Sequence, residues 1–214
     1  DHIIANSVPG VTLTEQDPLH AFNELARQIK EKGIVEISGD VLIDDRLFET
    51  MSKRATLLFS TDENVFVLSP IMINENLIDL IVNPGEVGQL ANVQHRPKVN
   101  GYTVTNQVKT VAKGEKTELK LSVDDTGKDI TIKGTVAADQ KELIRTTVIK
   151  NPAHFAKLAF IEALQKAGVK VNITSSAKLP ESAELKNLEP IALFTSPPLS
   201  EYAKLILKVS HNIG

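Results

Sequence analysis

One pattern limits the folds open to this chain: a helix that ends at a glycine and leads at once into a short β-branched strand. The pattern occurs twice, over residues 17–33 followed by 34–37, and over residues 151–168 followed by 169–173. Each copy opens on an Asx-Pro pair and closes on basic residues or glycine, which are the start and stop signals of helices. A repeated helix–strand unit predicts an α/β layer.

Between the two copies the sequence becomes strand-rich. Apolar runs bounded by turn formers predict buried strands at residues 39–45 and 76–82. From about residue 83 the apolar residues alternate with polar ones, which predicts strands at residues 103–105, 118–123, 130–136 and 143–149. Residues 124–127 read as the hairpin connector between two of them. Alternation leaves one face solvated, which favours an antiparallel sheet.

The predicted fold class is therefore α/β plus β. A discontinuous α/β domain covers residues 1–83 and 150–190, and a small antiparallel β domain at 84–149 is nested within it. Residues 179–190 are polar and bounded by proline, which is typical of a loop. After them Ser200 is a candidate N-cap for a helix that places Tyr202, Leu205, Ile206 and Val209 on one face. This last segment, 191–214, is predicted to start a further domain.

Composition excludes several functions. The chain has 214 residues and no Cys, so disulfides, thiolate nucleophiles and cysteine-held metals are excluded. A net charge of −3 with seven Phe, two Tyr and no Trp argues against nucleic-acid binding. The sequence contains no run of 18 consecutive apolar residues, so it predicts no transmembrane segment. Because the chain opens on Asp1 without a leader and stops directly after a helix, we expect a fragment of a longer protein.

Metal and phosphate sites find little support. The five histidines show no metal-ligand spacing: His2, His20, His95, His154 and His211. Asp40, Asp44 and Asp45 do not follow a calcium-loop spacing, so strand ends and a turn are the favoured interpretation. Gly85-x-x-Gly88 precedes β rather than helical sequence, which favours a turn over a phosphate loop.

Two serine motifs remain. Ser175-x-x-Lys178 has the spacing of a serine nucleophile and its lysine base, but it follows a predicted strand and precedes a proline. We interpret it as a chance match. Ser210-His211-Asn212 contains Ser-x-Asn, a second active-site element of the same enzymes, although a helix C-cap is the alternative because Asn is common there.

The context of Ser210-x-Asn212 is specific. The Ser-Pro-Pro-Leu-Ser sequence at 196–200 and the helix after it closely resemble the segment leading to the second motif of penicillin-binding protein 4-type D-alanyl-D-alanine carboxypeptidases (peptidase family S13, class C low-molecular-mass penicillin-binding proteins). Residues 32–48 and 151–169 are also similar, so the resemblance covers essentially the whole chain. In that family a transpeptidase-like domain carries an inserted α/β domain that itself holds a β domain, and residues 191–214 would return to the transpeptidase-like domain.

The resemblance implies a serine-type D-Ala-D-Ala carboxypeptidase or endopeptidase that acts on peptidoglycan stem peptides, binds β-lactams and lies in the cell envelope, periplasmic or extracytoplasmic. Of the family's catalytic residues only Ser210, as a proton relay, and Asn212, as a partner of the substrate amide and the catalytic lysine, carry over to this chain. His211 fills the variable position of the motif. No metal or organic cofactor is implied.

The family's Ser-x-x-Lys and Lys-Thr-Gly motifs would lie before Asp1 and beyond Gly214, so we expect the chain alone to be inactive. A non-catalytic cell-envelope binding or spacer module is the alternative. A periplasmic-type small-molecule binder is disfavoured, because two similar α/β lobes would be needed and the sequence offers a single helix pair.

Overall fold

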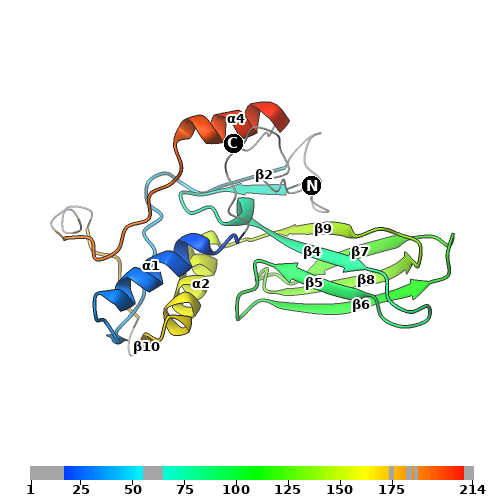
Figure 1. The fold of residues 1–214 in the computed structure, drawn as a ribbon, viewed down its shortest axis with the longest axis horizontal. Coiled ribbons are helices and arrows are strands. Elements are labelled where there is room, and N and C mark those ends of the chain that lie inside the picture. Colours follow the sequence, from blue (N-terminus) through cyan, green and yellow to red (C-terminus); the bar gives the residue numbers. More distant parts are fainter. Residues whose placement is uncertain (1–16, 55–64, 174–175, 182–184, 186–187, 210–214) are drawn as a thin grey trace. The chain divides into compact units, whose positions relative to one another are not determined.

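The computed structural model describes residues 17–54, 65–173, 176–181, 185 and 188–209 (Figure 1). The chain divides into two compact units, which we call the β unit, Phe48–Pro152, and the α/β unit, which joins the residues up to Leu47 with those from Ala153 onward. The α/β unit contains α1 (His20–Glu31), β1 (Glu36–Ser38), most of α2 (Pro152–Lys166), β10 (Lys170–Asn172) and α4 (Leu199–Val209). The β unit contains β2 (Met51–Arg54), β3 (Val65–Leu68), the 3-10 turn η2 (Asn74–Asn76), β4 (Leu77–Asn83), β5 (Asn92–Arg96), β6 (Thr103–Val111), β7 (Glu118–Val123), β8 (Asp129–Ala137) and β9 (Leu143–Val148).

The α/β unit is built on the repeated helix–strand pattern. Strands β1 and β10 pair in parallel, with Ile37 opposite Val171, although these two residues lie 134 positions apart in the sequence. Helices α1 and α2 contact each other through the tilted ring pair of Phe22 and Phe160, whose centroids lie 5.7 Å apart. The buried residues of this core are Ala26, Ile29, Val41, Ala163, Leu164 and Val169. The two predicted helices and the strands after them are confirmed.

Both helices end in the same way. Gly33 and Gly168 have φ angles of 84° and 80°, in the left-handed region that favours glycine. Each donates its N–H to the carbonyl three residues back, and the following residue donates to the carbonyl five residues back. This pairing is the Schellman motif, which satisfies carbonyls that a helix end leaves open. Lys30 Nζ also donates to the Gly168 carbonyl at 2.9 Å, so the two helix ends are joined.

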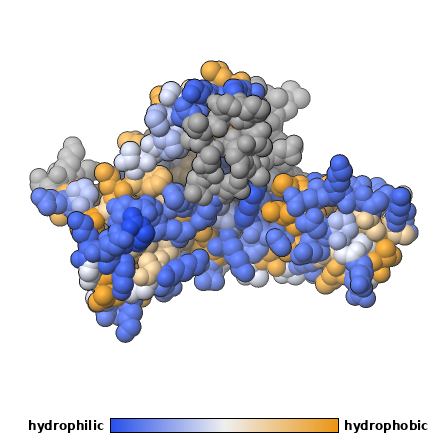
Figure 2. All heavy atoms as spheres, in the orientation of Figure 1, coloured by the Kyte–Doolittle hydropathy of each residue, from blue (hydrophilic) through white to orange (hydrophobic). Residues whose placement is uncertain are grey.

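The β unit contains two three-stranded sheets and the antiparallel pair β2–β3. The first sheet has the order β5-β4-β9 and is antiparallel throughout. The second has the order β6-β8-β7. Buried residues of both sheets include Ile78, Leu80, Val82, Val108, Ile130, Ile132 and Val136. Hydrophilic and hydrophobic residues are interspersed on the face of the β unit seen in Figure 2, which agrees with the alternating burial along β6 and β7.

Two predictions about strands are wrong. Strands β6 and β8 run parallel, so the second sheet is not purely antiparallel. Alternation shows that one face of a strand is exposed, but it does not show the direction of the strand. In this sheet β8 lies in the middle, with β6 on one side and β7 on the other. Residues 39–45 are irregular rather than a strand. Only Val41 among their apolar residues is buried, at 8% exposure, and Asp40 is used for side-chain bonds instead.

The division between the units falls at residues 47 and 48, earlier than the predicted boundary at 84. Strand β4, which the sequence assigned to the α/β domain, pairs with β5 over residues 79–83 and with β9 over residues 77–82, so it lies inside the β unit. The assignment of the two units to inserted domains of a larger protein stays a prediction. Within the described residues, no helix combines the length and apolar character needed to cross a membrane.

Candidate functional site

Helix α4 is the element that leads to the Ser-x-Asn motif. It begins at Leu199. The prediction that Ser200 is the N-cap is therefore wrong, because Ser200 lies inside the first turn of the helix. The Pro198 carbonyl accepts the Glu201 N–H at 2.9 Å, and the Glu201 carboxylate pairs with Lys204 Nζ at 2.6 Å. The negative charge of an acidic residue in the first turn also interacts favourably with the positive end of the helix dipole.

The burial of α4 follows the predicted face only in part. Leu205 and Ile206 are half-buried, whereas Tyr202 is 39% exposed and Leu207, on the opposite side, is 81% exposed. The helix ends at Val209. Ser210 and Asn212, the two predicted catalytic residues, lie outside the described residues, as does His211 between them.

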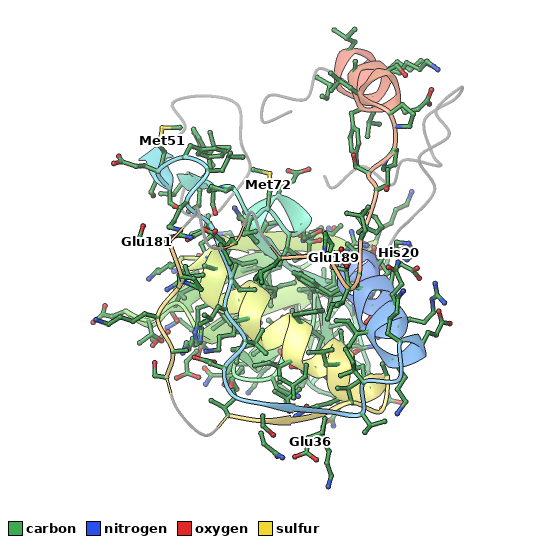
Figure 3. All side chains as sticks on the ribbon, turned by 90° about the vertical axis from the view of Figure 1, so that its left-hand side faces the viewer. His20, Glu36, Met51, Met72, Glu181 and Glu189 are labelled. Atoms are coloured by element: carbon green, nitrogen blue, oxygen red, sulfur yellow. The ribbon has the colours of Figure 1, made fainter. Side chains whose placement is uncertain are left out.

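The segment that precedes α4 is held against α1. Leu193 donates its N–H to Gln28 Oε1 at 2.9 Å and accepts from Gln28 Nε2 at 3.1 Å. The next residue, Phe194, contacts the His20 ring edge to face, with centroids 5.9 Å apart. Figure 3 shows His20 on α1, beside the segment that leads to α4. Sequence reasoning missed this contact because 165 residues separate its partners and no local pattern joins them.

Two of the three candidate cation residues, Asp40 and Asp44, are paired with the protein's own basic side chains. Asp40, whose side chain is 3% exposed, pairs with Lys157 Nζ at 2.5 Å. This bond lowers the pKa of the Asp40 carboxyl. Arg46 likewise binds Asp44, at 2.7 Å from Nε, and holds its pKa at about 2. Within the described part of the chain, no group of three or more His, Asp or Glu side chains is placed to hold a metal ion.

The glycine pair at 85–88 forms a turn, as predicted. Gly85 donates its N–H to Thr110 Oγ1 at 2.9 Å, and Gly88 donates to the Thr110 carbonyl at the same distance. Both backbone donors are therefore used within the fold and do not point at a phosphate. Of the Ser175-x-x-Lys178 pair, Ser175 lies outside the described residues, and residues 176–180 are irregular rather than helical. This agrees with the interpretation of that motif as a chance match.

A buried charge in the β unit was also missed, although the sequence carried a signal for it. Asp79 interrupts the apolar run of β4, and its side chain is fully buried. Arg96 Nε on β5 binds its carboxylate at 2.8 Å across the sheet, because the two residues are register partners. A carboxylate inside an apolar run needs a cationic partner.

The comparisons with known proteins bear on this architecture. Residues 6–214 match the sequence model of the D-Ala-D-Ala carboxypeptidase 3 (S13) family, so the chain belongs to that family. This confirms the resemblance on which the sequence analysis drew. No curated protein sequence matches the chain.

Two solved structures of penicillin binding protein 4 (dacB) from Haemophilus influenzae have a similar fold. The one complexed with a β-lactam is 18% identical over 80% of this chain, with a TM-score of 0.51. The other is 16% identical over 79% of this chain, with a TM-score of 0.54. The chain spans 37% and 39% of the lengths of these two proteins.

Proposed function

We propose that the chain is part of a serine-type D-Ala-D-Ala carboxypeptidase or endopeptidase of the cell envelope, periplasmic or extracytoplasmic, which acts on peptidoglycan stem peptides. The observation that carries the proposal is the family match over residues 6–214. A helix that ends at Val209, directly before Ser210, supports it. The inserted α/β and β domains predicted from the sequence would correspond to the two compact units.

In the proposed reaction a serine elsewhere in the full-length protein attacks the peptide carbonyl, and its lysine neighbour accepts the serine proton. The C–N bond breaks, the leaving amine takes a proton, and an acyl-enzyme remains until water hydrolyses it. The Ser210 hydroxyl both donates and accepts, which suits it to pass a proton toward the amine. The Asn212 amide offers a carbonyl to the lysine and an NH₂ to the substrate.

Labelling with a fluorescent penicillin tests this function. The full-length protein should become covalently labelled, whereas the 214-residue chain alone should not, because the proposed nucleophile lies outside it. In the full-length protein, Ser210→Ala should slow acylation on the order of 10²-fold, the usual scale of general acid–base assistance. Asn212→Ala should slow it as well.

Ser200→Ala is the matched control, since Ser200 is an exposed serine of the same helix and lies in its first turn. It should leave acylation unchanged. Covalent label on the 214-residue chain would contradict the proposal, and so would a Ser210→Ala protein that is acylated at the wild-type rate. An unlabelled full-length protein would favour the non-catalytic cell-envelope module instead.

A further inference from the structure

Gln28 forms an unusual pair with a distant stretch of backbone. Its side-chain amide accepts the N–H of Leu193 at 2.9 Å and donates to the carbonyl of the same residue at 3.1 Å. The second amide hydrogen of Gln28 reaches Glu24 Oε1 at 2.8 Å, one turn earlier on α1. Oxygen and nitrogen of the amide cannot be exchanged without breaking these bonds, because the Leu193 N–H needs an acceptor. We call the Gln28–Leu193 pair the amide clamp.

The residues beside the clamp are anchored too. Ala192 packs against the core that α1 and α2 share. Phe194 contacts His20 at the start of α1, the histidine that is labelled in Figure 3. Leu193 is 68% exposed, so the clamp holds this residue through its backbone and not through apolar burial.

The chain between the clamp and α4 is short and stiff. Four residues, 195–198, separate Phe194 from the first residue of α4, and two of them are Pro197 and Pro198. Proline fixes its own φ and restricts the residue before it. The Pro198 carbonyl then accepts the Glu201 N–H, so the stiff segment runs directly into the first turn of the helix.

We propose that Gln28 is a positioning residue for the reaction. The amide clamp fixes where the segment 192–198 leaves the α/β core, this segment sets the start of α4, and α4 sets the place of Ser210 and Asn212. The inference rests on the proposed function, because only then do these two residues need accurate placement. A displacement of about 1 Å at a reacting group can cost on the order of 10²-fold in rate.

The test uses the full-length protein with Gln28→Met. Methionine keeps the length of the side chain and suits a helix, but it removes both bonds to Leu193. Hydrogen exchange measured by mass spectrometry on peptides covering residues 191–196 should show faster exchange in the variant, with the thermal midpoint little changed. Acylation by fluorescent penicillin should slow about tenfold, a partial form of the misplacement penalty.

A double-mutant cycle separates positioning from general destabilisation. If Gln28 acts in part through Ser210, Gln28→Met should slow a Ser210→Ala protein less than it slows the wild type, because residues that act through one another are not additive. A merely structural role would give equal slowing in both backgrounds. Gln165→Met, at an exposed glutamine of α2, is the matched control and should change neither exchange nor acylation.

Failure of the inference differs from failure of the proposed function. An acylated wild type that is slowed by Ser210→Ala but not by Gln28→Met would overturn the inference alone, whereas a wild type that is not acylated would remove its basis. Should Gln28→Met fail to fold, Phe194→Ala provides a second test, since Phe194 is 37% exposed and its loss leaves the core intact. It should slow acylation in the same direction, and wild-type behaviour there would overturn the inference.

Discussion

Asn76 is fully buried and belongs to a run of three residues in the left-handed region, with Asn74, Glu75 and Asn76 at φ angles of 49°, 58° and 56°. Its Nδ2 donates to the Val67 carbonyl at 3.0 Å, and its backbone carbonyl accepts the Ile149 N–H at 2.7 Å. Asparagine suits this position because it tolerates a positive φ better than most residues and supplies the amide.

Replacement of Asn76 should separate these two contributions. Asn76→Gly removes the side-chain amide, but glycine still adopts the positive φ of this position. The substitution should lower the free energy of unfolding by about 2 kcal/mol, because the buried Val67 carbonyl loses its hydrogen-bond donor. Asn76→Ala should lose about 1 kcal/mol more, because a Cβ is strained in the left-handed region. Urea unfolding of the chain measures both. Alanine as stable as glycine would contradict the account.

The Asp40–Lys157 ion pair predicts a pH dependence. The pKa of Asp40 is lower in the folded chain than in the unfolded chain, mainly because of the Lys157 bond. The pair therefore stabilises the fold above the ordinary carboxyl pKa of about 4 and loses this effect as the pH falls through the lowered folded pKa. The stability difference between wild type and Asp40→Asn should be largest near neutral pH and shrink in acid.

Urea midpoints measured from neutral to acid pH test this dependence. Asp44→Asn is the control, because the Asp44–Arg46 pair is more exposed, with both side chains at 37%, and solvent weakens such pairs. Its effect on the midpoint should be small at every pH. A difference between wild type and Asp40→Asn that does not change with pH would count against the ion pair.

At the scale of single elements, Gly134 allows strands β7 and β8 of the second sheet to lie close together. It lies in β8 with a φ of 126°, and a Cβ there would sit 1.9 Å from the Glu118 carbonyl oxygen of β7. Gly134→Ala should destabilise the β unit by about 3 kcal/mol, since strands β7 and β8 must separate to admit the methyl group. Gly114→Ala is the control: its φ is 80°, but nothing lies within 4 Å, so only the backbone strain of about 1 kcal/mol applies. Thermal unfolding distinguishes them, and equal losses would argue against the contact.

Periodicity predicted the elements whose pattern is local and regular. Helices α1 and α2, and strands β4, β7, β8 and β9, were all predicted within a few residues of their bounds. The parallel pairing of β6 with β8 could not be predicted, because a strand's alternation is the same in either direction. Residues 39–45 were misjudged because an apolar run without a pairing partner does not form a strand.

The candidate site likewise has parts that the sequence predicts and parts that it does not. The context of their motif predicts Ser210 and Asn212 as catalytic residues, which stays a prediction, whereas the helix before them is confirmed. The amide clamp could not be found, since Gln28 and Leu193 show no spacing that links them. Contacts of this kind depend on how the whole chain folds back and not on any local preference.

At the scale of the whole molecule, all strand pairs from β2 to β9 close within residues 48–152. We therefore expect this segment, produced alone, to fold. Circular dichroism should show a β-rich spectrum and a single cooperative thermal transition, as for other small domains. A spectrum of an unfolded chain, or a gradual loss of signal on heating, would contradict this expectation.

The parallel pair β1–β10 has a consequence for the order of events during synthesis. Glu36 and its register partner Lys170 lie 134 positions apart in the sequence, and the β unit lies entirely between them. During synthesis on the ribosome, β1 has no strand to pair with until residue 170 has been made. Every strand of the intervening unit has its partner once residue 148 has been made. Because domains fold as units while the chain emerges, the segment inserted in the middle should acquire its native form first, and the layer that encloses it in sequence should be completed last.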